Sequence, residues 1–136
     1  MKSLTLSTAA TIIVLLAFTA CARTRAVTDR PVTLSAAPRE VPFLQPVTAA
    51  TSRRELCLVF ETPGESDAAS KVQAVLITTE GRRERLIPSR VDRRGEALVC
   101  LCDERGGAGP VRYRAAELSS ETPVRVREIR WWSGEG

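Results

Sequence analysis

The feature that most constrains this chain is an alternation of apolar and polar residues, which runs from Arg53 to Trp132. Successive side chains of a β-strand point to opposite faces, so a period of two residues is typical of strands that are buried on one side. Turn-forming residues interrupt the alternation at short intervals. The pattern predicts strands at Glu55–Glu61, Lys71–Thr79, Arg83–Ser89, Glu96–Cys102, Val111–Leu118 and Pro123–Trp132.

Short antiparallel strands with no convincing helix between them predict an all-β domain over residues 53–136. The number and spacing of the strands resemble the immunoglobulin-like architecture, in which two small antiparallel sheets pack face to face as a sandwich. A small closed barrel is the alternative.

The segment before this domain has a different composition. It has four prolines between residues 31 and 46, and no apolar run long enough to bury a face. Such a composition predicts a flexible tether, which we assign to residues 21–52 together with the cysteine at its start. Proline is tolerated on edge strands, so we expect one of two pieces, Pro31–Ser35 or Val41–Leu44, to join the sandwich.

The N-terminal residues combine a positive charge at Lys2, a mostly apolar run over Leu4–Phe18, and the small residues Thr19 and Ala20 before Cys21. The run is shorter than the roughly 20 apolar residues of a membrane-spanning helix, which favours a cleaved export signal over residues 1–20. Residues 1–21 resemble the lipobox signal of bacterial lipoproteins. The alternatives are an uncleaved N-terminal anchor and an ordinary signal cut before the cysteine, and each of these still exports the domain.

The resemblance to lipoproteins implies that Cys21 is acylated and becomes the first residue of the mature protein. In that family, an aspartate after the cysteine favours retention at the inner membrane, and this chain has Ala22. The resemblance therefore implies an exported, membrane-anchored protein on the periplasmic side of the outer membrane or on the cell surface, rather than at the inner membrane.

Three further cysteines, Cys57, Cys100 and Cys102, lie in the expected sandwich. An exported domain lies in an oxidising compartment, where a disulfide can form. Cys100 and Cys102 point to the same side of one strand, so either can pair with Cys57. Closing a loop of about 45 residues would stabilise the domain by roughly 4 kcal/mol on the chain-entropy model. A Cys-x-Cys pair without histidine is a poor metal site, so we expect no metal or cofactor.

The chain contains no histidine, which removes the commonest general base. Its acids mostly lie beside arginines, as in Arg53-Arg54-Glu55, and we interpret these runs as a solvated, mixed-charge surface. Together with the location that the resemblance to lipoproteins implies, these features predict a non-catalytic interaction or structural module of the cell envelope, such as an accessory subunit of a membrane assembly. A lipoprotein that binds a small ligand or glycan is the second hypothesis, and a carboxylate-dependent hydrolase ranks last.

The last two predicted strands allow a prediction of register. The turn at Ser119–Thr122 indicates a hairpin in which Ala115 lies opposite Val126. Without a bulge, this register would set apolar residues of the first strand against charged residues of the second. One extra residue at Arg127–Glu128 removes the conflict, so we predict a β-bulge there.

With this bulge, the residues that share the buried face are Val111, Tyr113, Ala115, Val124, Val126, Ile129 and Trp131. The opposite face carries Arg112, Arg114, Arg125, Arg130 and Trp132, with Glu128 able to pair with Arg114.

Consecutive strand residues point to opposite faces, so Trp131 and Trp132 are not both core residues. Trp132 either lies across arginine stems or belongs to a recognition patch, because tryptophan and arginine are enriched at binding hot spots. We take Arg112, Arg114, Arg130 and Trp132 as the candidate partner-binding residues. With a net charge of +4, carried almost entirely by arginine, an envelope protein or anionic head groups suit this patch better than nucleic acid.

Overall fold

The computed structural model describes residues 24–50, 52–105 and 109–132. The strands are β1 (Thr24–Ala26), β2 (Val32–Leu34), β3 (Arg39–Ala49), β4 (Arg53–Phe60), β5 (Val72–Thr78), β6 (Arg83–Leu86), β7 (Arg90–Arg93), β8 (Leu98–Glu104), β9 (Val111–Ser120) and β10 (Val124–Trp132). A 3-10 helix, η1 (Pro63–Lys71), lies between β4 and β5.

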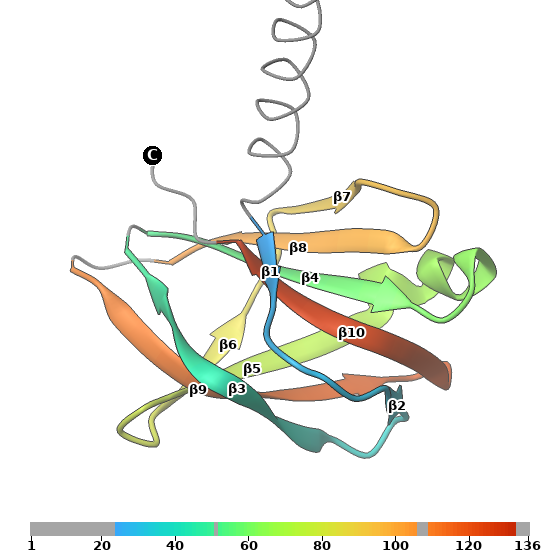
Figure 1. Ribbon diagram of the computed structural model, residues 1–136. Helices are drawn as coiled ribbons and strands as arrows, with labels where there is room; N and C mark the ends of the chain where they lie inside the picture. The colour runs from blue at the N-terminus through green and yellow to red at the C-terminus, as the bar shows by residue number, and fades with distance from the viewer. Residues whose placement is uncertain (1–23, 51, 106–108, 133–136) are drawn as a thin grey trace, which may run out of the picture.

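These strands form two antiparallel sheets packed face to face, which confirms the predicted sandwich (Figure 1). The six-stranded sheet A has the order β1-β10-β4-β8-β7, and β2 also pairs with β10. The four-stranded sheet B has the order β3-β9-β5-β6. The six strands expected from the alternation are confirmed as β4, β5, β6, β8, β9 and β10. Among the described residues, no helix has the length and apolar character needed to cross a bilayer.

The predicted tether is wrong for residues 24–49, because β1, β2 and β3 belong to the sandwich. Both short pieces expected as alternatives join it, and β3 extends over 11 residues. Val41, Phe43 and Val47 of β3 are buried, whereas Pro42 and Pro46 between them are exposed. β3 is an edge strand of sheet B, where a proline nitrogen needs no neighbouring carbonyl. The prolines therefore mark an edge strand rather than a coil.

The predicted bulge in β10 is confirmed, but its partner strand is wrong. The register between β10 and β4 shifts between Val126 and Glu128, which leaves Arg127 as the extra residue. β9 and β10 do not form a hairpin, because β9 lies in sheet B and β10 in sheet A. β9 has an irregularity of its own at Arg114, after which its core residues are Ala116 and Leu118.

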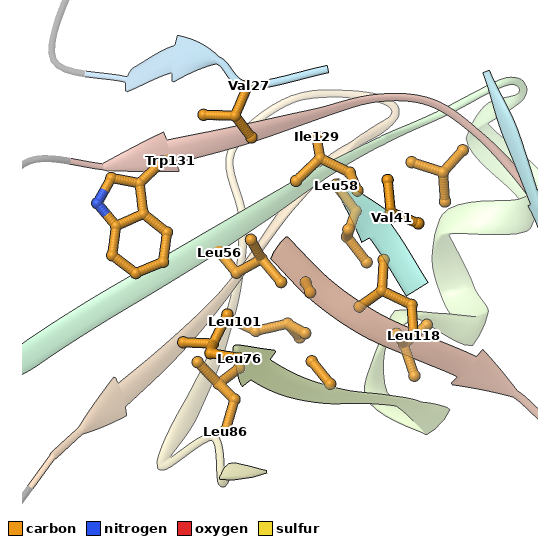
Figure 2. Close-up of a cluster of buried hydrophobic side chains, with 14 of the residues drawn as sticks. Val27, Val41, Leu56, Leu58, Leu76, Leu86, Leu101, Leu118, Ile129 and Trp131 are labelled. Atoms are coloured by element: carbon orange, nitrogen blue, oxygen red, sulfur yellow. The ribbon is translucent and has the colours of Figure 1, made fainter. Parts of the chain in front are cut away.

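The core lies between the two sheets, and side chains from both meet there (Figure 2). Leu56 and Leu58 of β4 face Leu76 of β5 and Leu118 of β9 across this layer. Trp131 lies toward one end of the layer, where its ring centroid is 5.8 Å from that of Tyr113.

Candidate functional site

The outer face of sheet A gathers charged and aromatic side chains near the start of β4. The pairing of β10, β4, β8 and β7 sets Trp132, Glu55, Cys102 and Arg90 in one row across four strands. Side chains of directly opposed residues point to the same face of a sheet. We call the following group the outer-face cluster: Arg53, Glu55, Arg90, Asp92, Arg94, Cys102 and Trp132.

Glu55 is the centre of the outer-face cluster, and its side chain is fully buried. Arg94 donates two hydrogen bonds to its carboxylate, at 2.9 and 3.0 Å, and Arg53 donates one at 2.8 Å. The Cys102 thiol donates a further bond at 3.3 Å. Burial opposes ionisation of Glu55, but these hydrogen bonds outweigh it and hold the pKa of the carboxyl below its usual value. Glu55 is therefore a structural anion that orders the groups around it.

A disulfide joins Cys57 to Cys100, which are directly opposed residues of β4 and β8. This confirms one of the two pairings expected from the sequence. Cys102 is free and buried, because the same register sets it opposite Glu55 instead of Cys57. None of the three thiols is placed with other ligands as a metal site would require, within the part of the chain that the structure describes.

The environment of Cys102 makes its thiol a weak acid. Burial, followed by the carboxylates of Glu55 and Asp92, raises the pKa of Cys102 to about 11. Cys102 therefore acts at neutral pH as a hydrogen-bond donor to Glu55 and is not a nucleophile.

This shift predicts a loss of stability in alkaline solution. The pKa of Cys102 is raised from 9.0 to about 11 in the folded protein, so the thiol ionises first in the unfolded chain. The free energy of unfolding should be unaffected by this group below pH 9 and fall as the pH rises towards 11. Chemical denaturation of the protein and of Cys102→Ser across this range measures the effect. Equal slopes for the two proteins would contradict it.

A second polar cluster lies inside the sandwich and joins the two sheets. Arg54 forms ion pairs with Asp103 of β8 and, at 3.1 Å, with Glu84 of β6. It also donates to the hydroxyl of Tyr113 on β9 at 3.2 Å, and that hydroxyl donates to Glu84 at 2.7 Å. Burial, together with the hydrogen bond to Glu84, raises the pKa of Tyr113. We call these four residues the inter-sheet cluster.

The solvated surface expected for Arg53-Arg54-Glu55 is therefore wrong for two of its residues. Arg54 and Glu55 are both buried, and they point to opposite faces of β4. Each tolerates burial because groups of opposite charge surround it. The alternation of β4, continued through its charged residues, is the signal that would have revealed both clusters.

The predicted partner-binding patch is not assembled as one surface. Arg112 and Arg114 lie on β9 in sheet B, whereas Arg130 and Trp132 lie on β10 in sheet A. The expected pair of Glu128 with Arg114 is also wrong. Arg114 pairs with Glu40 at 3.7 Å, and Arg130 pairs with Glu128 at 2.7 Å. The cause is the separation of β9 and β10 into different sheets, which puts the two pairs of candidates on different layers.

The two candidates on β10 keep an organised environment. The guanidinium carbon of Arg53 lies 4.4 Å from the centroid of the Trp132 ring, a cation–π contact. Arg130 donates to the backbone oxygen of Thr24 at 2.7 Å and to its hydroxyl at 3.2 Å. Trp132 is partly exposed and Trp131 is buried, as the alternation predicts. Trp132 and the exposed Arg53 thus form an aromatic–cation pair at the β10 side of the outer-face cluster.

A recess of about 460 Å³ lies away from the outer-face cluster, between η1 and the loop that leads into β10. It is lined by Thr62, Gly64, Glu65, Asp67, Ala68, Lys71, Thr122, Pro123 and Val124. No aromatic side chain lines this recess. It therefore offers no surface on which a sugar ring could stack. The lipidation candidate Cys21 lies outside the described residues.

Comparison with known proteins leaves the family open. No protein-family model matches this chain, and no curated protein matches it. A solved structure that resembles it is CBM32-1, from a family 31 glycoside hydrolase of Clostridium perfringens. The match covers 75% of each chain with 14% sequence identity and a TM-score of 0.45. At this level of similarity, nothing about the activity of that protein is carried over to this chain.

Proposed function

We propose that this protein is an exported, lipid-anchored and non-catalytic module of the cell envelope, which makes contacts through the outer-face cluster. The observation that supports this proposal most is the orientation of charge in that cluster. The side chains of Arg53 and Arg94 are 42% and 32% exposed, whereas that of Glu55 beneath them is 0% exposed. With Trp132 beside Arg53, the cluster presents residue types that are enriched at binding surfaces.

The pairing of the buried acids with arginines supports a non-catalytic role. General acid–base catalysis needs a titratable group that gains and loses a proton near the working pH. Arginines engage Glu55 and Asp103 directly, and the pKa of Glu55 is held below its usual value. The chain also has no histidine to take this role. These acids are therefore better suited to holding arginines in place than to proton transfer.

The anchor rests on Cys21 and is tested with radiolabelled fatty acid in the native host. We expect the wild-type protein to incorporate label and to begin at residue 21, because the resemblance to lipoproteins implies acylation of this cysteine. The Cys21→Ala variant should lose all label. The matched control is Cys102→Ala, which removes another thiol without altering the signal and should be labelled like the wild type. Intact mass of the purified proteins measures the modification, and an unmodified wild-type Cys21 would overturn the anchor.

A further inference from the structure

We infer that the surface around Trp132 rests on the anionic head groups of the membrane that holds Cys21. This inference rests on the proposed lipid anchor and names the partner of the outer-face cluster. Three features of the described residues carry it: the position of β1, the residues beside its first residue, and the outward direction of positive charge.

The first feature is the short distance along the chain between the acylation candidate and the folded domain. β1 begins at Thr24, three residues after Cys21. Three fully extended residues span at most about 11 Å. β1, β2 and β3 belong to the sandwich, so the chain has no long tether between Thr24 and the folded domain. An acyl group on Cys21 would therefore hold the start of β1 close to the bilayer surface. A domain held this close to the membrane would present the region around Thr24 to it.

The second feature is what lies beside the start of β1. Thr24 pairs with Trp132 at the end of β10. Arg130 donates hydrogen bonds to the backbone oxygen and to the hydroxyl of Thr24. Figure 1 shows the first residues of β1 next to the end of β10, on the same side of the sandwich as β4 and β8. The guanidinium of Arg53 lies against the Trp132 ring. The region that the anchor brings to the membrane is thus the tryptophan end of the outer-face cluster.

The third feature is the match between these residues and a head-group layer. Tryptophan is enriched at membrane–water interfaces, where its amphipathic ring lies at the level of the head groups. Arginines near a membrane surface are attracted to anionic lipids. In the outer-face cluster the arginines lie outermost: the Arg90 side chain is 56% exposed and that of its partner Asp92 is 29% exposed. The carboxylates therefore lie beneath the arginines and balance their charge, while the exposed guanidinium groups contact the phosphates of the lipid head groups.

Quenching of tryptophan fluorescence by brominated lipids tests this contact. The acylated protein is purified from its own membranes and reconstituted into vesicles of phosphatidylglycerol and phosphatidylcholine, with bromine on the acyl chains near the head groups. The chain has two tryptophans, and Trp131 is 1% exposed within the core. We expect brominated lipid to quench the wild-type protein and Trp132→Phe to lose most of that quenching. Vesicles without phosphatidylglycerol should give weaker quenching.

Two arginine variants give a matched comparison. Arg53→Gln removes a cation beside Trp132, whereas Arg112→Gln removes an exposed cation of sheet B. We expect the first to reduce quenching several-fold and the second to leave it unchanged, with thermal denaturation confirming that both are folded. Equal quenching in the two variants would overturn the role of Arg53 and with it the inference.

The mass of the N-terminal peptide from the same sample separates failure of the inference from failure of the anchor. If Cys21 is acylated and the wild-type protein is quenched no more than Trp132→Phe, the anchor stands. The inference is then overturned, and the cluster is open to a protein partner. If Cys21 is not acylated, the anchor and the inference both fail.

Discussion

Replacing Arg54 with methionine is expected to lower the free energy of unfolding by about 3–5 kcal/mol, the usual cost of removing one partner from a buried ion pair. The Arg54 and Asp103 side chains are 4% and 6% exposed, so the variant leaves a carboxylate buried without its cation. It also removes the bond to the Tyr113 hydroxyl, which helps to join the two sheets. Urea denaturation followed by circular dichroism measures the loss.

The chain offers a matched control for this variant in Arg82. Its side chain is 63% exposed and pairs with Glu84 at 3.4 Å, so it shares an acidic partner with Arg54. Arg82→Met should change stability by no more than about 0.5 kcal/mol, as is typical of exposed pairs. The double variant Arg54→Met/Asp103→Leu should be more stable than Arg54→Met alone, because no unpaired carboxylate remains at position 103. If Arg54→Met costs no more than Arg82→Met, the inter-sheet cluster does not stabilise the fold as we describe.

Replacing Trp131 with alanine is expected to cost about 3–5 kcal/mol, the range for removing a large buried aromatic side chain. Trp131 is 1% exposed, packs against Tyr113 and donates from its ring nitrogen to the backbone oxygen of Thr48 at 3.2 Å. The variant therefore leaves a cavity and removes the hydrogen bond to the Thr48 carbonyl. Chemical denaturation followed by far-ultraviolet circular dichroism gives the change without depending on tryptophan emission.

Trp132 is the matched comparison for Trp131, since the two residues are adjacent and chemically identical. Trp132→Ala removes a partly exposed ring and one cation–π contact with Arg53, which is worth about 0.5–1 kcal/mol at an exposed site. A loss of about 1 kcal/mol or less is expected. Similar losses in the two variants would show that Trp132 is part of the packing and would weaken its assignment to a contact surface.

The alternation of residues was sufficient to predict which side chains of β10 are buried. Val126 and Ile129 have the same environment in the structure as in the prediction, and so does Trp131. The bulge at Arg127 was predicted from a register with the wrong partner strand, yet it is correct, because Val126 and Ile129 are both buried although they lie three residues apart in β10. These properties are local, since they follow from the geometry of a single strand.

The partner of each strand was not predictable in the same way. β9 and β10 are joined by a short loop, which favours a hairpin, yet they enter different sheets. The alternation of a strand shows which of its faces is buried. It is the same whether the next strand along the chain pairs with it in one sheet or lies in the sheet packed opposite. The candidate patch was split for this reason, and Arg130 and Trp132 were separated from Arg112 and Arg114.

The sequence by itself thus determined the all-β class, the buried and exposed faces of β10, and the opposite environments of Trp131 and Trp132. Only the tertiary structure decided the pairing of Cys57 with Cys100, the membership of β1 to β3 in the sandwich, and the burial of Arg54 and Glu55. The physical reason is that the face of a strand depends on the period of its own residues. Its neighbours, and the burial of its charges, depend on contacts between residues far apart in the chain.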